Sequence, residues 1–413
     1  MDDNLIEVEL TGMAVTGEAV GHHDRRIVFV PFGIPGERVL ARVTEDARRY
    51  SRAELVEILT PSLHRAAAPC PHFGTCGGCQ WQHIDYAHQL ACKEVVVAQQ
   101  LTHRGPVANA PVRAAIGMSD PWGYRNQVDV LIGAEGGLGF LDVAYSGFVP
   151  VGGCMVADPW LWELASGVDL AEAGVSSMSV RTGLNTDDVL IVFETQDDLA
   201  PALELDLPVS CVLRHDDGSI VTLAGEPWYR EVLGERAFRI SANSFFPVNT
   251  AALEVLLSVV ETGLGLVGYE TLLDVFCGVG TYGISLADRV AQVICVDSAG
   301  EAIEDATANA SAAGCDNVVF TAGEVERALS TVDQAVNAAI ITAPHDGCPV
   351  ATWAALGRIR PQRLVYISEN ANSLALDAKR IAELGYSLRE VQPLDMFPQT
   401  SLTLTVSSWS LAR

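Results

Sequence analysis

A glycine-rich turn with acidic residues around it is the part of the sequence best suited to hold a small molecule. It runs Asp274-Val-Phe-Cys-Gly278-Val-Gly280-Thr-Tyr-Gly283, between a predicted strand and a predicted helix. Glycines there let the backbone approach a ligand closely, and the amino end of the helix favours a negatively charged group. Because the spacing Gly-x-Gly-x-x-Gly also fits a dinucleotide, the turn by itself leaves NAD open.

The acidic residues around the turn favour S-adenosylmethionine. Asp274 lies four residues before the first glycine, where its carboxylate can meet the amino group of a methionine moiety, a cation that NAD lacks. Asp297 ends the next predicted strand and can hold both ribose hydroxyls, and Glu324 follows the third strand, near the expected adenine. A purely structural role for the series stays open. The predicted cofactor-binding residues are Asp274, Phe276, Gly278, Gly280, Asp297 and Glu324.

A cluster of cysteines forms a second candidate site. The spacing is Cys70-x5-Cys76-x2-Cys79, and Cys154, in Gly-Gly-Cys-Met, is a candidate distant fourth ligand. Four thiolates suit either zinc or a [4Fe–4S] cluster, and spacing alone does not choose between them. Unliganded thiols are the remaining alternative. In a cytoplasmic chain, such a cluster indicates metal binding rather than disulfides.

The charge and the chain ends limit the partners that we expect. The formal net charge of −26 disfavours a general nucleic-acid binder, so RNA would have to be bound through a local group of arginines. No apolar run approaches the roughly 20 residues that span a bilayer. The acidic start, Met1-Asp2-Asp3, lacks the basic segment of a signal peptide. We expect a cytoplasmic monomer with no membrane contact.

Three domains are predicted to position these residues. Short alternating strands with Gly and Pro turns indicate an OB-like β-barrel over residues 1–62. Mixed strands and turns indicate an α+β central domain over 63–240, which carries the cysteines. Within it, a helix at about 85–112 is expected to pack on the C-terminal domain. Strands alternate with helices over 241–413, which predicts a parallel, doubly wound, Rossmann-like sheet.

Taken together, these features resemble the bacterial tRNA and large-subunit rRNA uracil-5-methyltransferases over nearly the whole chain. The resemblance implies a TRAM barrel and a class I methyltransferase domain. It also favours S-adenosylmethionine over NAD and a [4Fe–4S] cluster over zinc. The matching stretches are Gly17-Glu-Ala-Val-Gly21, Val28-Phe-Val-Pro31, Pro35-Gly-Glu37, the four cysteines, Tyr124-Arg-Asn126, Leu273-Asp-Val-Phe-Cys-Gly-Val-Gly-Thr281, Ala306-x-x-Asn-Ala310 and Asp395-Met-Phe-Pro-Gln-Thr400.

The chemistry of that family needs two side chains that do not stand at the matching positions. A cysteine thiolate adds to C6 of uracil, and after methylation a carboxylate removes the C5 proton. Here Glu369 occupies the nucleophile position and Leu404 the base position, so no catalytic residue is retained. The family's Asp-Pro-Pro-Arg loop appears as Thr342-Ala343-Pro344-His345, and the glutamine of Phe-Phe-Gln-Val-Asn appears as Pro247. Cys348 is a possible replacement nucleophile.

Three functions follow from this pattern. In the first, the chain descends from RNA uracil-5-methyltransferases and binds S-adenosylmethionine, RNA or both, with C5 methylation impaired or lost. In the second, it methylates a nitrogen or an oxygen of RNA by direct transfer, with Glu369 as general base. In the third, it is a binding or regulatory protein that no longer acts on RNA, which suits the charge of −26.

Overall fold

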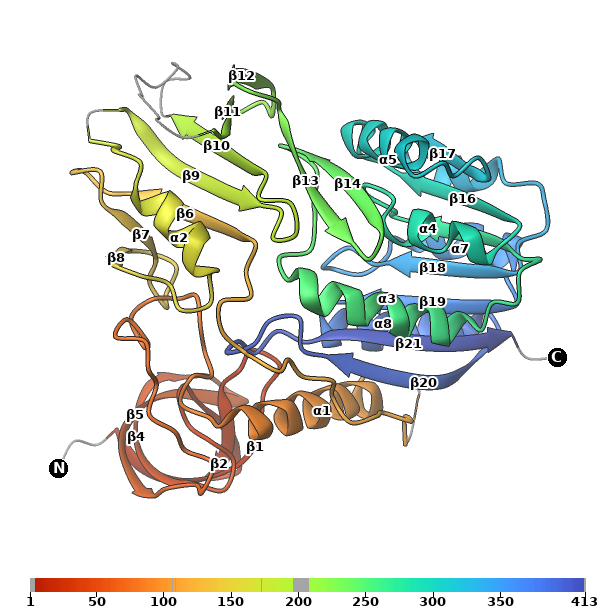
Figure 1. The fold of residues 1–413 in the computed structure, drawn as a ribbon. Coiled ribbons are helices and arrows are strands. Elements are labelled where there is room, and N and C mark those ends of the chain that lie inside the picture. The colour runs from red at the N-terminus through yellow and green to blue at the C-terminus, as the bar shows by residue number, and fades with distance from the viewer. Residues whose placement is uncertain (1–3, 106, 108, 172, 196–207, 412–413) are drawn as a thin grey trace.

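The chain forms an N-terminal barrel, a central sheet and a C-terminal α/β domain, with one long helix running from the barrel across the last of these (Figure 1). The computed structural model describes residues 4–105, 107, 109–171, 173–195 and 208–411. None of the helices in these ranges is both long and apolar enough to cross a bilayer.

The barrel closes from five strands in the order β1-β2-β3-β5-β4. Its interior is filled by apolar side chains at alternate positions, such as Val8, Leu10, Val28 and Val30. Buried Glu37 ties the barrel to the segment that follows, because its carboxylate accepts hydrogen bonds from Arg65 Nε at 2.7 Å. The predicted barrel is confirmed. Its strands are β1 (Leu5–Met13), β2 (Ala19–His23), β3 (Arg26–Val30), β4 (Arg38–Asp46) and β5 (Tyr50–Thr60).

A seven-stranded sheet, in the order β12-β11-β10-β9-β6-β7-β8, forms the central part. Helix α2 (Pro159–Ser166) covers one face and buries Leu161 and Ala165 there. A separate hairpin then leads into the C-terminal domain. The sheet contains β6 (Gln127–Ile132), β7 (Leu138–Leu141), β8 (Phe148–Pro150), β9 (Val175–Thr182), β10 (Val189–Thr195), β11 (Ser210–Arg214) and β12 (Ile220–Ala224), and the hairpin contains β13 (Trp228–Leu233) and β14 (Arg236–Ser241).

The C-terminal sheet has the order β17-β16-β15-β18-β19-β21-β20. Its first five strands are parallel, which confirms the predicted Rossmann-like arrangement. The antiparallel pair β20–β21 at its end was not predicted. The strands are β15 (Thr271–Val275), β16 (Gln292–Asp297), β17 (Val318–Ala322), β18 (Ala338–Thr342), β19 (Arg363–Ser368), β20 (Tyr386–Leu394) and β21 (Leu404–Leu411).

Helices cover both faces of this sheet. On one face, α3, α4 and α5 contribute to an apolar cluster with residues such as Leu256 and Ile284. On the other, α6, α7 and α8 form a second cluster, to which α1 adds Val97 and Leu101. The helices are α1 (Tyr86–His103), α3 (Thr250–Leu264), α4 (Thr281–Ser285), α5 (Gly300–Ala312), α6 (Val325–Ser330), α7 (Val350–Ile359) and α8 (Ala371–Glu383), with a short 3₁₀ turn at Ala287–Arg289.

Helix α1 is bound to the C-terminal domain by a buried ion pair. Lys93 Nζ lies 2.5 Å from Asp395 Oδ1, and both side chains are fully buried. The same ammonium donates to the carbonyl of Phe397 at 3.2 Å and lies over the ring of Trp81. Because a charge out of water needs a partner, this pair fixes the helix against the segment that contains Asp395.

The other parts of the chain meet the same segment, residues 395–402, which we call the docking segment. Gln89 of α1 exchanges hydrogen bonds with Gln399, and the amide of Trp81 donates to the carbonyl of Gln399 at 3.0 Å. Tyr124 Oη donates to the carbonyl of Pro398 at 3.1 Å. On the barrel, a Cβ at Gly17 would lie 2.7 Å from Ser401 Cβ, so the backbone of Gly17 is in close contact with the side chain of Ser401.

We predict that Lys93→Met lowers the free energy of unfolding by about 3–5 kcal/mol, because Asp395 would be left buried without its counter-charge. The measurement is urea unfolding followed by tryptophan fluorescence. The matched control is Lys379→Met, since Lys379 is the other lysine and makes a solvent-exposed contact with Glu383. The control should change stability by less than about 0.5 kcal/mol. Equal effects of the two substitutions would contradict the role of the pair.

Candidate functional site

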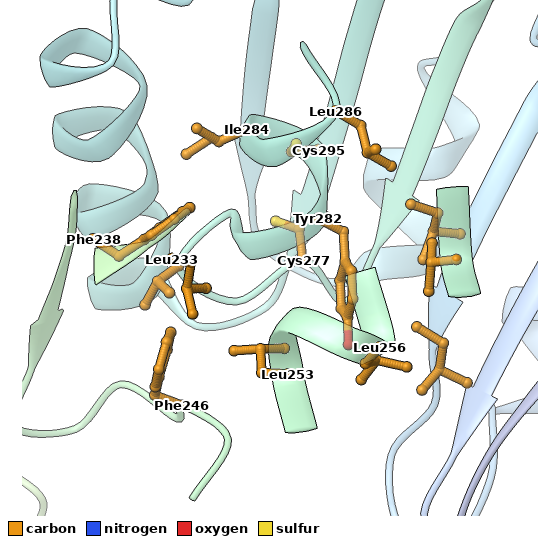
Figure 2. Packing of buried hydrophobic residues seen from close by; sticks show 14 of the residues in the cluster. Leu233, Phe238, Phe246, Leu253, Leu256, Cys277, Tyr282, Ile284, Leu286 and Cys295 are labelled. Carbon is orange, nitrogen blue, oxygen red and sulfur yellow. The ribbon is translucent and has the colours of Figure 1, made fainter. Parts of the chain in front are cut away.

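The glycine-rich turn follows β15 and has a backbone that most residues avoid. Phe276, Gly278 and Gly280 all have positive φ, at 60°, 54° and 84°. A Cβ at Gly280 would meet Ile284 Cδ1 at 2.6 Å, and one at Gly283 would meet Cys295 Sγ at 2.7 Å, so packing requires glycine at both positions. A Cβ at Gly278 would meet nothing within 4 Å. The turn is therefore packed on one side, as Figure 2 shows around Ile284 and Cys295, and open at Gly278.

Asp274 lies beneath this turn and is fully buried. Its Oδ2 accepts a hydrogen bond from the amide of Gly283 at 2.9 Å. Its Oδ1 has no partner among the described residues. Burial raises the pKa of Asp274 to about 7, the Gly283 amide opposes the rise, and the charge of Asp297 adds to it. A cationic group of a ligand would satisfy the free oxygen and stabilise the carboxylate.

Asp297 ends β16 beside the same turn. Its two carboxylate oxygens accept from the amides of Gly278 at 2.8 Å and Ala299 at 2.9 Å, so it also holds the turn in shape. Glu324 begins α6 after the adjacent strand and is exposed, and the amide of the preceding residue, Gly323, bonds the carbonyl of Asp297. The predicted cofactor-binding residues thus lie at the carboxyl ends of β15, β16 and β17, the usual ligand-binding edge of such a sheet.

Glu369 lies at the carboxyl end of β19 and faces this edge. Its side chain is partly buried, and burial raises its pKa while nearby His345 opposes the rise. Burial also raises the pKa of Tyr282, and the carboxylates of Asp274 and Glu369 both add to that rise. Tyr282 of α4 therefore interacts electrostatically with both Asp274 and Glu369. The order of the strands changes between β15 and β18, and the two acids lie on opposite sides of that point, Asp274 on β15 and Glu369 after β19.

The loop after β18 approaches the turn that contains Glu369. Asn370 Nδ2 lies 3.5 Å from His345 Nε2 and donates to the carbonyl of His345 at 3.3 Å. Thr342 Oγ1, at the end of β18, is buried with no hydrogen-bond partner among the described residues. Polar side chains of Thr342, His345 and Asn370 therefore gather beside Glu369.

Leu404 and Cys348 lie in apolar surroundings. Leu404 begins β21, is 3% exposed and packs in the cluster that contains Ile367 and Met396. Cys348 is also 3% exposed, in the cluster on the opposite face of the sheet. Its amide donates to Asp377, and burial raises the pKa of its thiol, so the geometry does not favour Cys348 as a nucleophile.

The four predicted metal ligands line one cavity of about 140 Å³ in the central domain, between the segment before α1 and the loop before α2. Cys154 interacts electrostatically with Cys76 and Cys79, although it is distant in sequence. Burial raises the pKa of Cys79 to about 11. In the part of the chain that the structure describes, no group of three His, Cys, Asp or Glu side chains is close enough to hold a single metal ion.

Arg125 adjoins the cysteines and was not predicted as a site residue. Its side chain lines both the cysteine cavity and a larger cavity of about 650 Å³. Its Nε is buried and has no hydrogen-bond partner among the described residues. The larger cavity lies where the three parts of the chain meet, and its polar or aromatic lining includes Glu18, Phe32, Arg52, Gln80, Arg125, Tyr145, Thr400 and Ser401. Sequence could not place it, because it exists only once the domains dock.

Two family models match parts of the chain. Residues 5–56 match the model of the TRAM domain, and residues 268–352 match a model described as a methyltransferase domain. An uncharacterized RNA methyltransferase of Thermosynechococcus vestitus is 33% identical, with 97% of each chain covered. Another, from Listeria innocua, is 34% identical, with 96% of this chain and 95% of the relative covered.

A solved structure shares the fold over nearly the whole length. It is Pyrococcus abyssi tRNA (uracil-54, C5)-methyltransferase in complex with S-adenosyl-L-homocysteine. The two structures match with a TM-score of 0.76 and 24% sequence identity, over 98% of this chain and 100% of the other. The likeness includes the barrel, the central part and the C-terminal domain in a single arrangement.

The raised pKa of Asp274 gives a stability prediction with a definite sign. Between pH 3.8 and about 7 the folded chain keeps a proton that the unfolded chain has lost, so this residue destabilises the fold increasingly as pH rises. In urea unfolding, the stability of Asp274→Asn relative to the wild type should therefore increase from about pH 4 to about pH 8, by roughly 4 kcal/mol. Asp316→Asn removes an exposed carboxylate and is the control. A difference that stays constant with pH would disprove the assignment.

Proposed function

The chain belongs to a family of RNA methyltransferases, and from that premise we propose that it binds S-adenosylmethionine and RNA but does not methylate C5 of uracil. The observation that carries the proposal is the pairing of an intact cofactor turn with Glu369 and Leu404 at the positions where uracil chemistry needs a thiolate and a base. We place this function in the cytoplasm.

The residues at the turn fit S-adenosylmethionine. The free oxygen of Asp274 is available to the ammonium of the methionine moiety, and Gly278 leaves room for a close approach to the backbone. Asp297 keeps acceptor capacity for ribose hydroxyls on oxygens that already hold the turn. When bound, the cofactor supplies an electrophilic methyl group on a sulfonium. The chain's part is to orient that group toward the carboxyl ends of β18 and β19.

The acceptor side of the site argues against C5 methylation. A carboxylate is a far weaker nucleophile toward C6 than a thiolate, so Glu369 cannot start the reaction. Leu404 offers no proton acceptor, and it is packed among apolar side chains. Cys348 is buried on the other face of the sheet, so it does not supply the missing thiolate.

Direct methyl transfer to a nitrogen or an oxygen is the second candidate, and one observation favours it. Glu369 is partly buried with a raised pKa, faces the cofactor edge and has His345 near it, which suits a general base. In that reaction Glu369 would take the proton of the acceptor while the methyl group moves in line. A regulatory protein without RNA has only the overall charge in its favour.

Local features support RNA as the partner despite the net charge of −26. Seven of the 26 basic residues lie within residues 4–60, which contain nine of the 52 acidic residues. The barrel is thus nearly balanced while the rest of the chain is strongly acidic. The large cavity beneath the barrel adds Arg52 and Arg125, and we propose that RNA enters there.

A [4Fe–4S] cluster fits the cysteine cavity better than zinc does. A zinc site draws all its sulfurs to one ion, about 2.3 Å away, whereas the cluster spreads four thiolates over four iron atoms. Four cysteines around one cavity suit the second arrangement. The buried guanidinium of Arg125 would offset the negative charge of four thiolates.

The function is tested by incubating an unmodified tRNA transcript with the protein and S-adenosylmethionine and then analysing its nucleosides by mass spectrometry. We expect no 5-methyluridine, and the Pyrococcus abyssi enzyme serves as the positive control. Formation of 5-methyluridine would overturn the proposal. A different methylated nucleoside, lost in Glu369→Gln, would establish the second candidate instead.

Titration calorimetry of the same preparation should detect S-adenosylmethionine binding. Asp297→Ala should weaken it by about tenfold or more, because charged hydrogen bonds to the ribose are lost. The melting temperature of the variant is measured alongside, since Asp297 also holds the turn. Absence of binding by the wild type would mean that the turn is a relic.

The cluster is tested by visible absorbance and iron analysis of protein purified without oxygen. We expect broad visible absorbance and stoichiometric iron, both lost in Cys79→Ser. Cys315→Ser is the matched control, because Cys315 is equally part-buried but lies outside the cavity. Colourless protein with stoichiometric zinc would contradict the assignment.

A further inference from the structure

Arg181, in the central sheet, is a buried cation on which the carboxylates of Asp129 and Glu301 act electrostatically. It lies near the end of β9 and is 7% exposed. Its Nε donates to Ser179 Oγ at 3.2 Å and its Nη1 to the carbonyl of Ala242 at 2.8 Å, which uses two of its five N–H groups. Within the described ranges it forms no ion pair at 4.0 Å or less. Burying a charge in this way is costly unless an anion compensates it.

The side chain of Arg181 lines a cavity of about 390 Å³ that is separate from the cofactor turn and from the cysteines. Arg214, on β11, lines the same cavity and also pairs with Glu194. Gln127, Asn243 and Ser244 add polar side chains to the lining, and Asp129 is the one carboxylate among its described residues. In a chain with a net charge of −26, this is a cavity where arginines outnumber acids.

The loop that closes this cavity also packs against the cofactor turn. Ala242, which accepts the hydrogen bond from Arg181, begins the loop. Phe245 of the loop lines the cavity with its ring 67% exposed. The next residue, Phe246, also lines the cavity and packs in the apolar cluster that contains Val279 and Tyr282 (Figure 2). The cavity therefore lies one loop away from the site of methyl transfer.

We propose that Arg181 and Arg214 form a subsite for a phosphate group, and that RNA supplies it from a nucleotide next to the one that enters the candidate site. This rests on the proposed binding of RNA. The planar guanidinium fork binds phosphate oxygens in pairs, and an RNA strand offers one phosphate at every nucleotide. An exposed aromatic ring beside a phosphate site is also the combination that proteins use for single-stranded RNA.

The test compares two arginines of the same surface region. Binding of a fluorescein-labelled oligouridylate is followed by anisotropy at several salt concentrations. Arg214→Gln should weaken affinity about tenfold and lower the slope of log K against log[salt] by about 0.7, the loss of one phosphate contact. Arg230→Gln removes the same charge from nearby β13, at a side chain that is 55% exposed and outside the cavity. It should leave affinity within about twofold.

A second variant and a second probe make the outcomes distinct. Arg181→Lys keeps the charge but loses the fork, so it should weaken binding with little change in melting temperature. If the wild type binds the oligouridylate and Arg214→Gln behaves like Arg230→Gln, the subsite is wrong and the proposed RNA binding stands. If only inorganic phosphate binds, raising the melting temperature of the wild type but not of Arg214→Gln, RNA is the wrong source. If neither probe binds, both proposals fail.

Discussion

The buried pair of Lys93 and Asp395 is the constraint on which the arrangement of the whole chain depends. Neither buried charge is stable without the other, because both are shielded from water. Helix α1 must therefore lie across the C-terminal sheet, even though the central sheet follows it in sequence. That position lets α1 complete one apolar face of the C-terminal domain. The docking segment then holds the segment before α1 and the central part by hydrogen bonds from Trp81 and Tyr124. This is a structural reason for the Asp-Met-Phe-Pro-Gln-Thr sequence, independent of catalysis.

The two halves of the candidate site, the cofactor side and the acceptor side, differ in their effect on the stability of the fold. On the donor side, Phe276 has a left-handed backbone, and Asp274 has a buried oxygen without a partner. Such features destabilise the fold and are compensated only when a ligand is bound. On the acceptor side, Leu404 adds to the apolar core instead of presenting a carboxylate to it. The proposed cofactor turn thus contains features that destabilise the fold without a ligand, whereas Leu404, at the proposed base position, contributes to the packing.

Sequence predicted those parts of the structure whose partners are close in the chain or follow a simple period. The barrel and the alternating strands and helices were predicted in this way. Asp274 and Asp297 were predicted to lie near the glycine-rich turn because each stands at or near the end of a predicted strand. The hairpin β20–β21 was missed because β21 buries Thr405 and Ser407 fully, so it lacks the apolar pattern of a buried strand. Arg125 and Arg181 were missed because their burial beside cavities depends on which distant residues surround them. No local pattern carries that information.

The acidic charge of the chain is compatible with the proposed binding of RNA once distance is considered. At physiological salt, charges more than about 8 Å apart are largely screened, so acids on remote surfaces do little to an RNA strand already in contact. The same acids lower the chance of encounter with the wrong polyanion, because non-specific association depends on summed charge. Favourable contacts are then confined to the nearly balanced barrel and to cavities lined by Arg52, Arg125 and Arg181. Under the proposed RNA binding, a strand gains affinity only by reaching those cavities, so the net charge would act on selectivity more than on the strength of binding.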